Sequence, residues 1–150
     1  MKHLIILMVT LSIFTLFSRS SSLAGASQQV VIVNRNNPTT QLTASDLKRI
    51  YNGNIKLWNN GHTVVPVVMS DSDPLSINFI KRVFGVDIDI WRGLWIQKSL
   101  SGNAAPPHQE KNCSSVINFI ASEPGAIGFI KKENLTGDVK VISIDGKTEF

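Results

Sequence analysis

The stretch Glu123-Pro124-Gly125-Ala126-Ile127-Gly128-Phe129-Ile130 carries the strongest information about the fold. Its Pro-Gly pair is typical of the end of a helix, and the apolar run from Ala126 to Ile130 suits a buried strand. Upstream, the spacing of Val116, Ile117 and Ile120 predicts a helix over about 114–122. A helix that leads through a short turn into a buried strand is typical of an α/β domain.

The chain before and after this stretch alternates in the same way. Strands are predicted at 29–34, 63–69, 126–130 and 139–144, helices at 43–51, 73–84 and 87–98, and irregular segments at 34–41 and 99–108. Thr43 is expected to be an N-cap, and Pro66 indicates an edge or irregular strand. The order of elements predicts an α/β fold with a mixed β-sheet flanked by helices.

The first 26 residues have the pattern of a secretory signal. Lys2 and His3 precede an apolar run of about 14 residues from Leu4 to Phe17, and Ala24-Gly25-Ala26 forms a small-residue cleavage site. The run is shorter than the roughly 20 residues that span a bilayer, which favours a cleaved signal over a permanent anchor. We therefore expect a signal peptide at 1–26, a single domain at 27–150 and a periplasmic location.

Composition narrows the function of that domain. Cleavage would leave 124 residues, enough for one core, and the loss of Lys2 and Arg19 would lower the formal charge from +4 to +2. The basic residues are scattered, so a nucleic-acid partner is not expected. His62, His108 and the only cysteine, Cys113, lack metal-site spacing, so no metal or other cofactor is expected. Cys113 precedes a predicted helix, where it is either mildly activated or a buried, inert thiol.

No catalytic pattern stands out in the sequence. It contains no Ser/His/Asp order with a nucleophile elbow, no pair of carboxylates in a recognisable catalytic context and no Gly-rich phosphate loop. We therefore expect the protein not to be an enzyme.

Several short motifs, in a fixed order, point to one family. They are Leu42-Thr43, Ile50-Tyr51-Asn52-Gly53, Trp58, the apolar run 64–68, the helix entrance at Asp73, Ser101-Gly102 and the stretch 123–129. Together they resemble the PstS-like phosphate-binding proteins of phosphate ABC transporters, which belong to the type 2 periplasmic binding proteins. The resemblance covers one lobe, domain two, of a family whose members have two, and it implies a single PBP-type-2-like lobe.

The resemblance also implies a ligand site. In that family two lobes close on phosphate, and the matching lobe supplies an arginine and a Ser-Gly-Thr turn at a helix N-terminus, where free N–H groups favour an anion. The segment in register here is 69–76, and its candidate ligand-binding residues are Ser70, Asp71, Ser72 and Ser76. The segment departs from the pattern, because no arginine precedes Asp71, the glycines are missing and Pro74 removes one N–H.

Each candidate has a structural alternative. Serine and aspartate before a helix are ordinary caps, and the carboxylates of Asp71 and Asp73 would repel an anion unless it is protonated or a cation intervenes. Trp91 and Trp95 are expected to anchor the core together with Ile88 and Leu94, although they could instead stack on a ligand. Trp58, in a turn, is expected to be the exposed aromatic residue.

Two functions follow as hypotheses. The first is an exported, non-catalytic binding protein for phosphate or a similar small oxyanion, associated with transport or sensing, in which a homodimer or a membrane transporter or sensor supplies the missing second wall. The alternative is a ligand-free periplasmic adaptor module that contacts a membrane sensor or transporter through a protein surface.

Overall fold

The computed structural model describes residues 28–102 and 104–149 of the chain. The elements are β1 (Gln29–Asn34), β2 (Gln41–Leu42), α1 (Ala44–Tyr51), β3 (Val65–Met69), α2 (Pro74–Phe84), α3 (Ile88–Leu100), β4 (His108–Glu110), α4 (Cys113–Ser122), β5 (Ala126–Lys131), the short 3-10 helix η1 (Lys132–Asn134) and β6 (Val139–Ile144). The predicted signal peptide at 1–26 lies outside the described residues. Among those described, no helix combines the length and apolar character needed to cross a bilayer.

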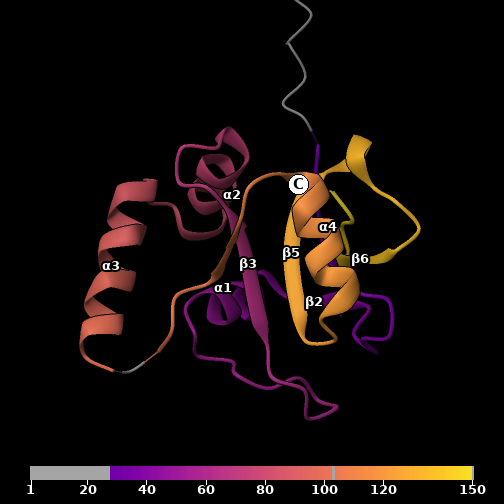
Figure 1. The fold of residues 1–150 in the computed structure, drawn as a ribbon, viewed down its shortest axis with the longest axis horizontal. Helices are drawn as coiled ribbons and strands as arrows, with labels where there is room; N and C mark the ends of the chain where they lie inside the picture. The colour runs from indigo at the N-terminus through magenta and orange to yellow at the C-terminus, as the bar shows by residue number, and fades with distance from the viewer. Residues whose placement is uncertain (1–27, 103, 150) are drawn as a thin grey trace, which may run out of the picture.

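The strands form one mixed sheet in the order β2-β6-β1-β5-β3-β4 (Figure 1). β3 runs parallel to both β4 and β5, whereas β1 is antiparallel to its neighbours β5 and β6. The carboxyl ends of β3, β4 and β5 therefore meet at one edge of the sheet, where β1 begins. The predicted α/β fold with a mixed sheet flanked by helices is confirmed.

Helices cover both faces of the sheet, and β5 shows how the sequence assigns them. Successive side chains of a strand point to opposite faces. A Cβ placed on Gly128 would lie 2.7 Å from Ile120 of α4, so this face carries α4. The next residue, Phe129, stacks on Phe79 of α2 with ring centroids 3.8 Å apart and lies 6.3 Å from the ring of Tyr51 of α1. α1 and α2 therefore cover the opposite face.

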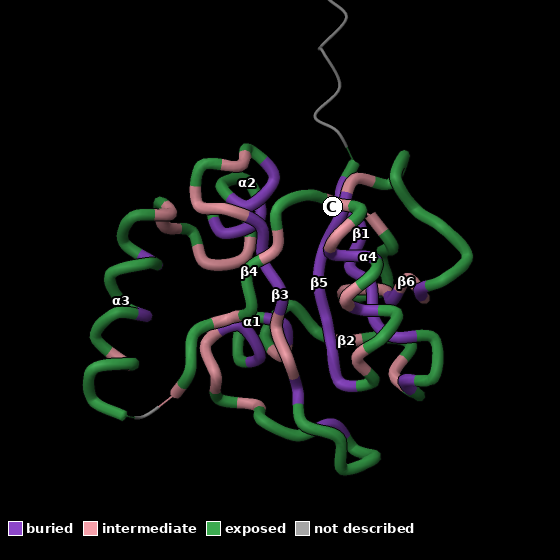
Figure 2. The backbone as a smooth tube through the Cα atoms, viewed as in Figure 1, coloured by how far each residue is buried: buried purple, intermediate pink, exposed green. Residues whose placement is uncertain are grey.

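The core follows the central strands. All six residues of β1 and the first five of β5 are buried, and they appear as continuous purple segments in Figure 2. The buried Tyr51 side chain links α1 to two strands of this core. Its hydroxyl donates to the carbonyls of Val67 in β3 and Ile127 in β5 at 3.1 and 3.3 Å. Burial raises the pKa of the Tyr51 hydroxyl, which therefore stays protonated as a donor.

The local signals placed most elements correctly. Thr43 caps α1 through its Oγ, which accepts from the Asp46 N–H at 3.0 Å, and Gly85 ends α2 with a φ of 72°. Two short strands were missed, since β2 begins at Gln41 in the expected loop and β4 begins at His108 in the expected irregular segment. Pro66 lies in β3 beyond the three residues that pair with β4, so there β3 pairs only with β5.

The prediction of an exposed Trp58 is wrong. Only 7% of this residue is exposed, and its indole N–H donates to the carbonyl of Gly125 at 2.9 Å. The turn around residues 59–61 is exposed as expected, but the indole of Trp58 packs against the chain just before β5. A contact across 67 residues of chain thus overrides the local turn signal.

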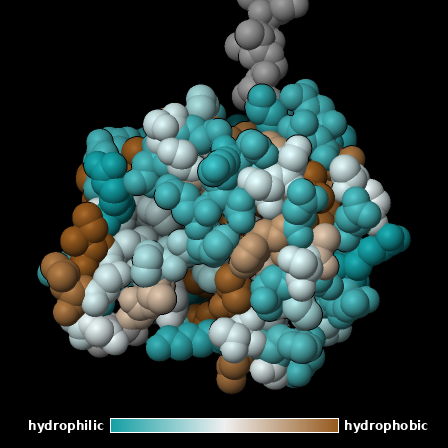
Figure 3. Space-filling model, in the orientation of Figure 1, coloured by the Kyte–Doolittle hydropathy of each residue, from teal (hydrophilic) through white to brown (hydrophobic). Residues whose placement is uncertain are grey.

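The predicted inward face of α3 is half right. Trp91 and Trp95 are buried, but Leu94 is 47% exposed and does not share their face. Ile90, Ile96 and Leu100 are also exposed, so α3 carries apolar side chains on its outer surface as well. In Figure 3 apolar surface gathers at the left of the molecule, where Figure 1 places α3. The periodicity was ambiguous because the helix is apolar on more than one side.

Candidate functional site

The edge where β3, β4 and β5 end is the expected place for a ligand, because loops at the carboxyl ends of strands surround it. Three segments meet there. They are 70–73 between β3 and α2, 111–112 between β4 and α4, and the end of β5 at Lys131. A cleft of about 290 Å³ lies between them and is lined by Met69, Asp73, Leu75, Asn112, Cys113, Ser114, Lys131 and Asn134.

The entrance of α2 forms one wall of this cleft. Asp73 is the N-cap, and its Oδ1 accepts from the Leu75 N–H at 2.8 Å. Pro74 occupies the first helical position and has no N–H to offer. The helix therefore already holds a carboxylate at its positive end, where the resemblance implied an anion.

The entrance of α4 forms the other wall. Asn112 caps this helix with a neutral amide, whose oxygen accepts from the Ser115 N–H at 2.9 Å, and the Ser115 hydroxyl reaches back to the Asn112 N–H in a capping box. No acidic residue lies in the first turn of α4. Its partial positive charge is therefore not offset by a carboxylate in that turn.

Lys131 supplies the full positive charge in the cleft. Its Nζ lies 3.8 Å from Glu133 Oε1, a long pairing in which the two side chains are 43% and 70% exposed. Exposed pairs of this kind hold each other weakly. The ammonium group is therefore available to a ligand. Cys113, the half-buried first residue of α4, lines the same cleft.

The structure separates the four residues predicted from the sequence. Ser70 and Ser72 lie together, with their hydroxyl oxygens 3.0 Å apart. Ser76 is buried, and its hydroxyl both accepts from the Met69 N–H at 3.1 Å and donates to the Met69 carbonyl at 3.0 Å. The Ser76 hydroxyl therefore fastens α2 to the end of β3.

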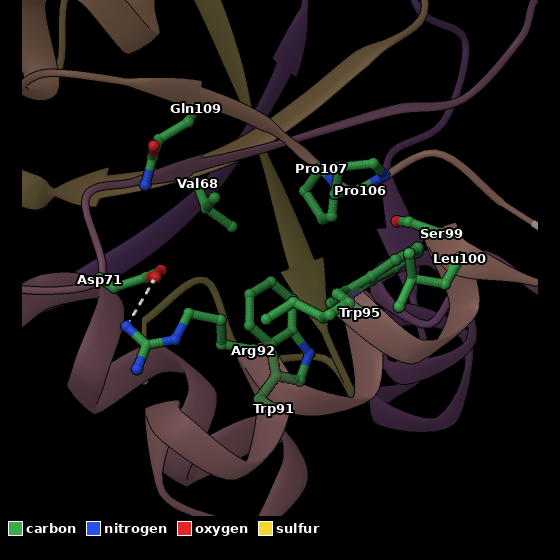
Figure 4. Close-up of a pocket in the computed structure, with 11 residues that line it drawn as sticks. Val68, Asp71, Trp91, Arg92, Trp95, Ser99, Leu100, Pro106, Pro107 and Gln109 are labelled. Carbon is green, nitrogen blue, oxygen red and sulfur yellow. Dashed lines mark hydrogen bonds and ion pairs between the residues drawn. The ribbon is translucent and has the colours of Figure 1, made fainter.

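Asp71 does not line this cleft and instead points toward Arg92 of α3, as Figure 4 shows. Its Oδ2 lies 3.4 Å from Nη1 of Arg92, and Nη2 of the same guanidinium donates to Asp89 at 2.6 Å. No arginine precedes Asp71 in the segment 69–76, but α3 places Arg92, 21 residues later in the chain, beside it. Arg92, Asn112 and Lys131 are the polar residues that the sequence reasoning missed.

At the same edge of the sheet, the Glu110 carboxyl of β4 pairs with the imidazole of His108. A hydrogen bond from His108, with Nε2 and Oε1 2.9 Å apart, lowers the pKa of the Glu110 carboxyl. His108 also stacks on Phe119 of α4 with centroids 4.0 Å apart. Within the described part of the chain, no three His, Cys, Asp or Glu side chains gather in a way that could hold a metal ion.

Known proteins with a similar sequence or fold identify the family of this chain. The family model for the PBP superfamily domain matches residues 16–142. An ABC-type phosphate transport receptor from Vibrio cholerae superposes with a TM-score of 0.66 and 21% identity over 82% of this chain and 48% of the other. No curated protein sequence matches the chain significantly.

Two further solved structures have the same fold. One is from Clostridium perfringens, is described as a phosphate ABC transporter substrate-binding protein with bound phosphate, and has a TM-score of 0.65 with 20% identity over 80% of this chain and 46% of that one. PstS from Borrelia burgdorferi has a TM-score of 0.59 with 17% identity, covering 80% and 48%. The chain thus spans about half the length of these proteins. It belongs to the PBP superfamily, as a single lobe with the fold of phosphate-binding proteins.

Proposed function

We propose that the protein is a non-catalytic receptor for a small protonated oxyanion, with hydrogen phosphate as the leading ligand, and that the ligand binds in the cleft between the entrances of α2 and α4. Export to the periplasm and association with a transporter or sensor in the membrane are part of the proposal. The phosphate bound to the Clostridium perfringens protein, which shares the fold, supports the choice of ligand.

One observation carries the proposal: two helix N-termini and Lys131 line the same cleft at the carboxyl edge of the sheet. Helix N-termini favour anions, and a lysine adds a full charge. The neutral cap of α4 leaves its positive end less compensated than that of α2. An oxyanion is therefore expected against α4 and Lys131, with α2 facing it.

Asp73 gives the cleft a means of selecting its ligand. A carboxylate repels a fully ionised oxyanion but accepts a hydrogen bond from one that still carries a proton. Phosphate carries such a proton at neutral pH and sulfate does not. The half-buried Asp73 carboxylate on the α2 side is thus expected to favour phosphate.

A single lobe leaves the cleft open to water, which limits each net hydrogen bond to about 0.5–1.5 kcal/mol. We expect a second wall to come from another copy of the chain or from a membrane partner. The absence of any catalytic constellation in the sequence supports binding without chemistry.

The test is isothermal titration of the protein with phosphate and, separately, with sulfate, at concentrations where sedimentation velocity reports both monomer and any dimer. Saturable heat with phosphate that is lost in Lys131→Met would support the proposal. Lys140→Met is the control, since Lys140 lies in β6 and does not line the cleft. Equal heats of phosphate binding in Lys131→Met and Lys140→Met would mean that phosphate does not bind at Lys131.

A second candidate function is recognition of a membrane partner without a ligand. The exposed side chains of Ile90 and Leu94, which are four residues apart and share one face of α3, favour it, because exposed apolar surface is typical of a protein contact. Leu94→Glu should then abolish co-purification with the membrane fraction of producing cells. Retention of the variant in that fraction would count against this candidate.

A further inference from the structure

We propose that a second site, the groove between α3 and the β3–β4 side of the sheet, binds a free α-amino acid with a large apolar side chain. The groove is separate from the oxyanion cleft, with which it shares no lining residue. The inference therefore does not depend on the proposed phosphate site.

The groove is the larger of the two hollows, with a volume of about 540 Å³. Its floor is Val68 of β3, α3 forms one side and Pro106 and Pro107 form the other. Figure 4 shows Asp71, Arg92 and Gln109 at one end of the groove and Trp95, Leu100, Pro106 and Pro107 at the other, together with Ser99. Such a division selects a ligand with a charged head and an apolar body.

The polar end presents opposite charges side by side. The Arg92 guanidinium and the Asp71 carboxylate lie 3.4 Å apart, farther than the 2.7–2.9 Å of a close charge-assisted hydrogen bond. The Arg92 side chain is 49% exposed, and its Nη2 also pairs with Asp89 Oδ1 at 2.6 Å. The Gln109 side chain projects to the same end. A loose pair of this kind can accept a carboxylate on Arg92 and an ammonium group on Asp71.

Charge at this end also excludes a simple oxyanion. One guanidinium faces the carboxylates of both Asp71 and Asp89, so the cluster is net negative. A phosphate would add charge of the same sign, whereas a zwitterion adds none. The two sites are therefore expected to differ in ligand class although both follow the end of β3.

The apolar end is built from flat and rigid surfaces. Trp91 and Trp95 pack edge to face with centroids 6.2 Å apart, and both line the groove. Leu100 and the two prolines lie at that end with Ser99, which adds a hydroxyl group there (Figure 4). Tryptophan and proline surfaces contact aromatic or branched aliphatic side chains without losing rotamer freedom. Phenylalanine combines a suitable side chain with both charged groups.

Isothermal titration with L-phenylalanine tests this site. Two analogues, each of which keeps one of the two charged groups of the amino acid, test the carboxylate and the ammonium group separately. 3-Phenylpropionate retains the carboxylate alone, and 2-phenylethylamine retains the ammonium group alone. Saturable heat is expected for L-phenylalanine, with each analogue at least about tenfold weaker, because a charge-assisted hydrogen bond is lost. Equal affinity for L-phenylalanine and either analogue would overturn the proposal, as would no saturable heat at millimolar L-phenylalanine.

Substitutions assign the two charges. Arg92→Gln is expected to weaken the binding of L-phenylalanine at least about tenfold and to change the binding of 2-phenylethylamine little. Asp71→Asn is expected to weaken the binding of L-phenylalanine to a similar extent and to change the binding of 3-phenylpropionate little. Arg82→Gln and Asp138→Asn are matched controls outside the groove, and all four should melt cooperatively. Loss of binding in the controls, or none in Arg92→Gln and Asp71→Asn, would contradict the assignment. Lys131→Met is expected to bind L-phenylalanine as the wild type does, which would show that this site is independent of the phosphate site.

Discussion

β5 and α3 are both rich in apolar residues, but they use them in opposite ways. β5 pairs with β1 and β3, and its side chains fill the core on both faces of the sheet. α3 buries Trp91 and Trp95 and leaves Ile90, Leu94, Ile96 and Leu100 at the surface. Packing thus leaves little freedom in β5, whereas the surface of α3 remains available for binding.

The difference is sharpest at two glycines. A Cβ on Gly125, just before β5, would lie 1.8 Å from the backbone oxygen of Thr63, whereas a Cβ on Gly93 in α3 would meet nothing within 4 Å. Gly125 also accepts hydrogen bonds through its carbonyl from Val65 and Trp58. The same methyl group should therefore have opposite effects at the two positions.

Gly125→Ala is expected to have the largest effect. The clash is with backbone, which cannot move aside without breaking the contact between β5 and the chain before β3. We expect the free energy of unfolding to fall by more than about 4 kcal/mol, or the protein not to fold. Urea unfolding followed by circular dichroism measures this, and a stability equal to that of the wild type would refute the close approach at Thr63.

Phe79→Ala tests the core contact of β5. Phe79 stacks on Phe129 and lies 4.9 Å from the ring of Tyr51, so truncation should cost about 3–5 kcal/mol of unfolding free energy. Leu94→Ala on α3 is the comparison, with an expected change within about 0.5 kcal/mol because the side chain is exposed. Similar losses in the two variants would mean that α3 is covered in solution.

Gly93→Ala should stabilise the protein. Glycine inside a helix costs roughly 0.5–1 kcal/mol relative to alanine, and the added methyl group meets no neighbour here. The midpoint of urea unfolding should rise by the corresponding amount. A lower midpoint would show that another surface approaches α3 closely at this glycine.

Glu110→Gln should produce the smallest change, and only in acid. His108 lowers the pKa of the folded Glu110 carboxyl, so its contribution to stability is present above the unfolded pKa and is lost as the pH falls through the folded pKa. The wild-type melting temperature should therefore drop more between neutral and acidic pH than that of Glu110→Gln. Parallel melting curves across this range would show that the His108 contact does not form.

Much of the fold could be predicted from the sequence because its signals are local. The Pro-Gly turn before β5, Thr43 before α1 and Asp73 with Pro74 before α2 each act on neighbouring residues. β4 escaped prediction because His108-Gln109-Glu110 has no apolar pattern, and only pairing with β3 makes it a strand. The prediction of an exposed Trp58 was wrong for a similar reason, since its hydrogen bond to the Gly125 carbonyl, 67 residues away in the chain, accompanies its burial.

The candidate sites were less predictable. The sequence placed Ser70, Asp71 and Ser72 at a helix entrance, but the fold turns Asp71 toward Arg92 and fastens Ser76 to Met69. Lys131 and Asn112 join Asp73 only because β3, β4 and β5 end at the same edge. Sheet topology, which no local pattern encodes, therefore determines which polar residues share a cleft.

The cleft is proposed to recognise a protonated oxyanion through Asp73, and the ratio of phosphate to sulfate affinity in Asp73→Asn tests this recognition most directly. Asparagine preserves the cap on α2 but removes the charge. The wild type should bind phosphate in preference to sulfate, and the variant should bind sulfate more tightly than the wild type does, which narrows the ratio. A ratio unchanged by the substitution, or no phosphate binding by either protein, would contradict the account.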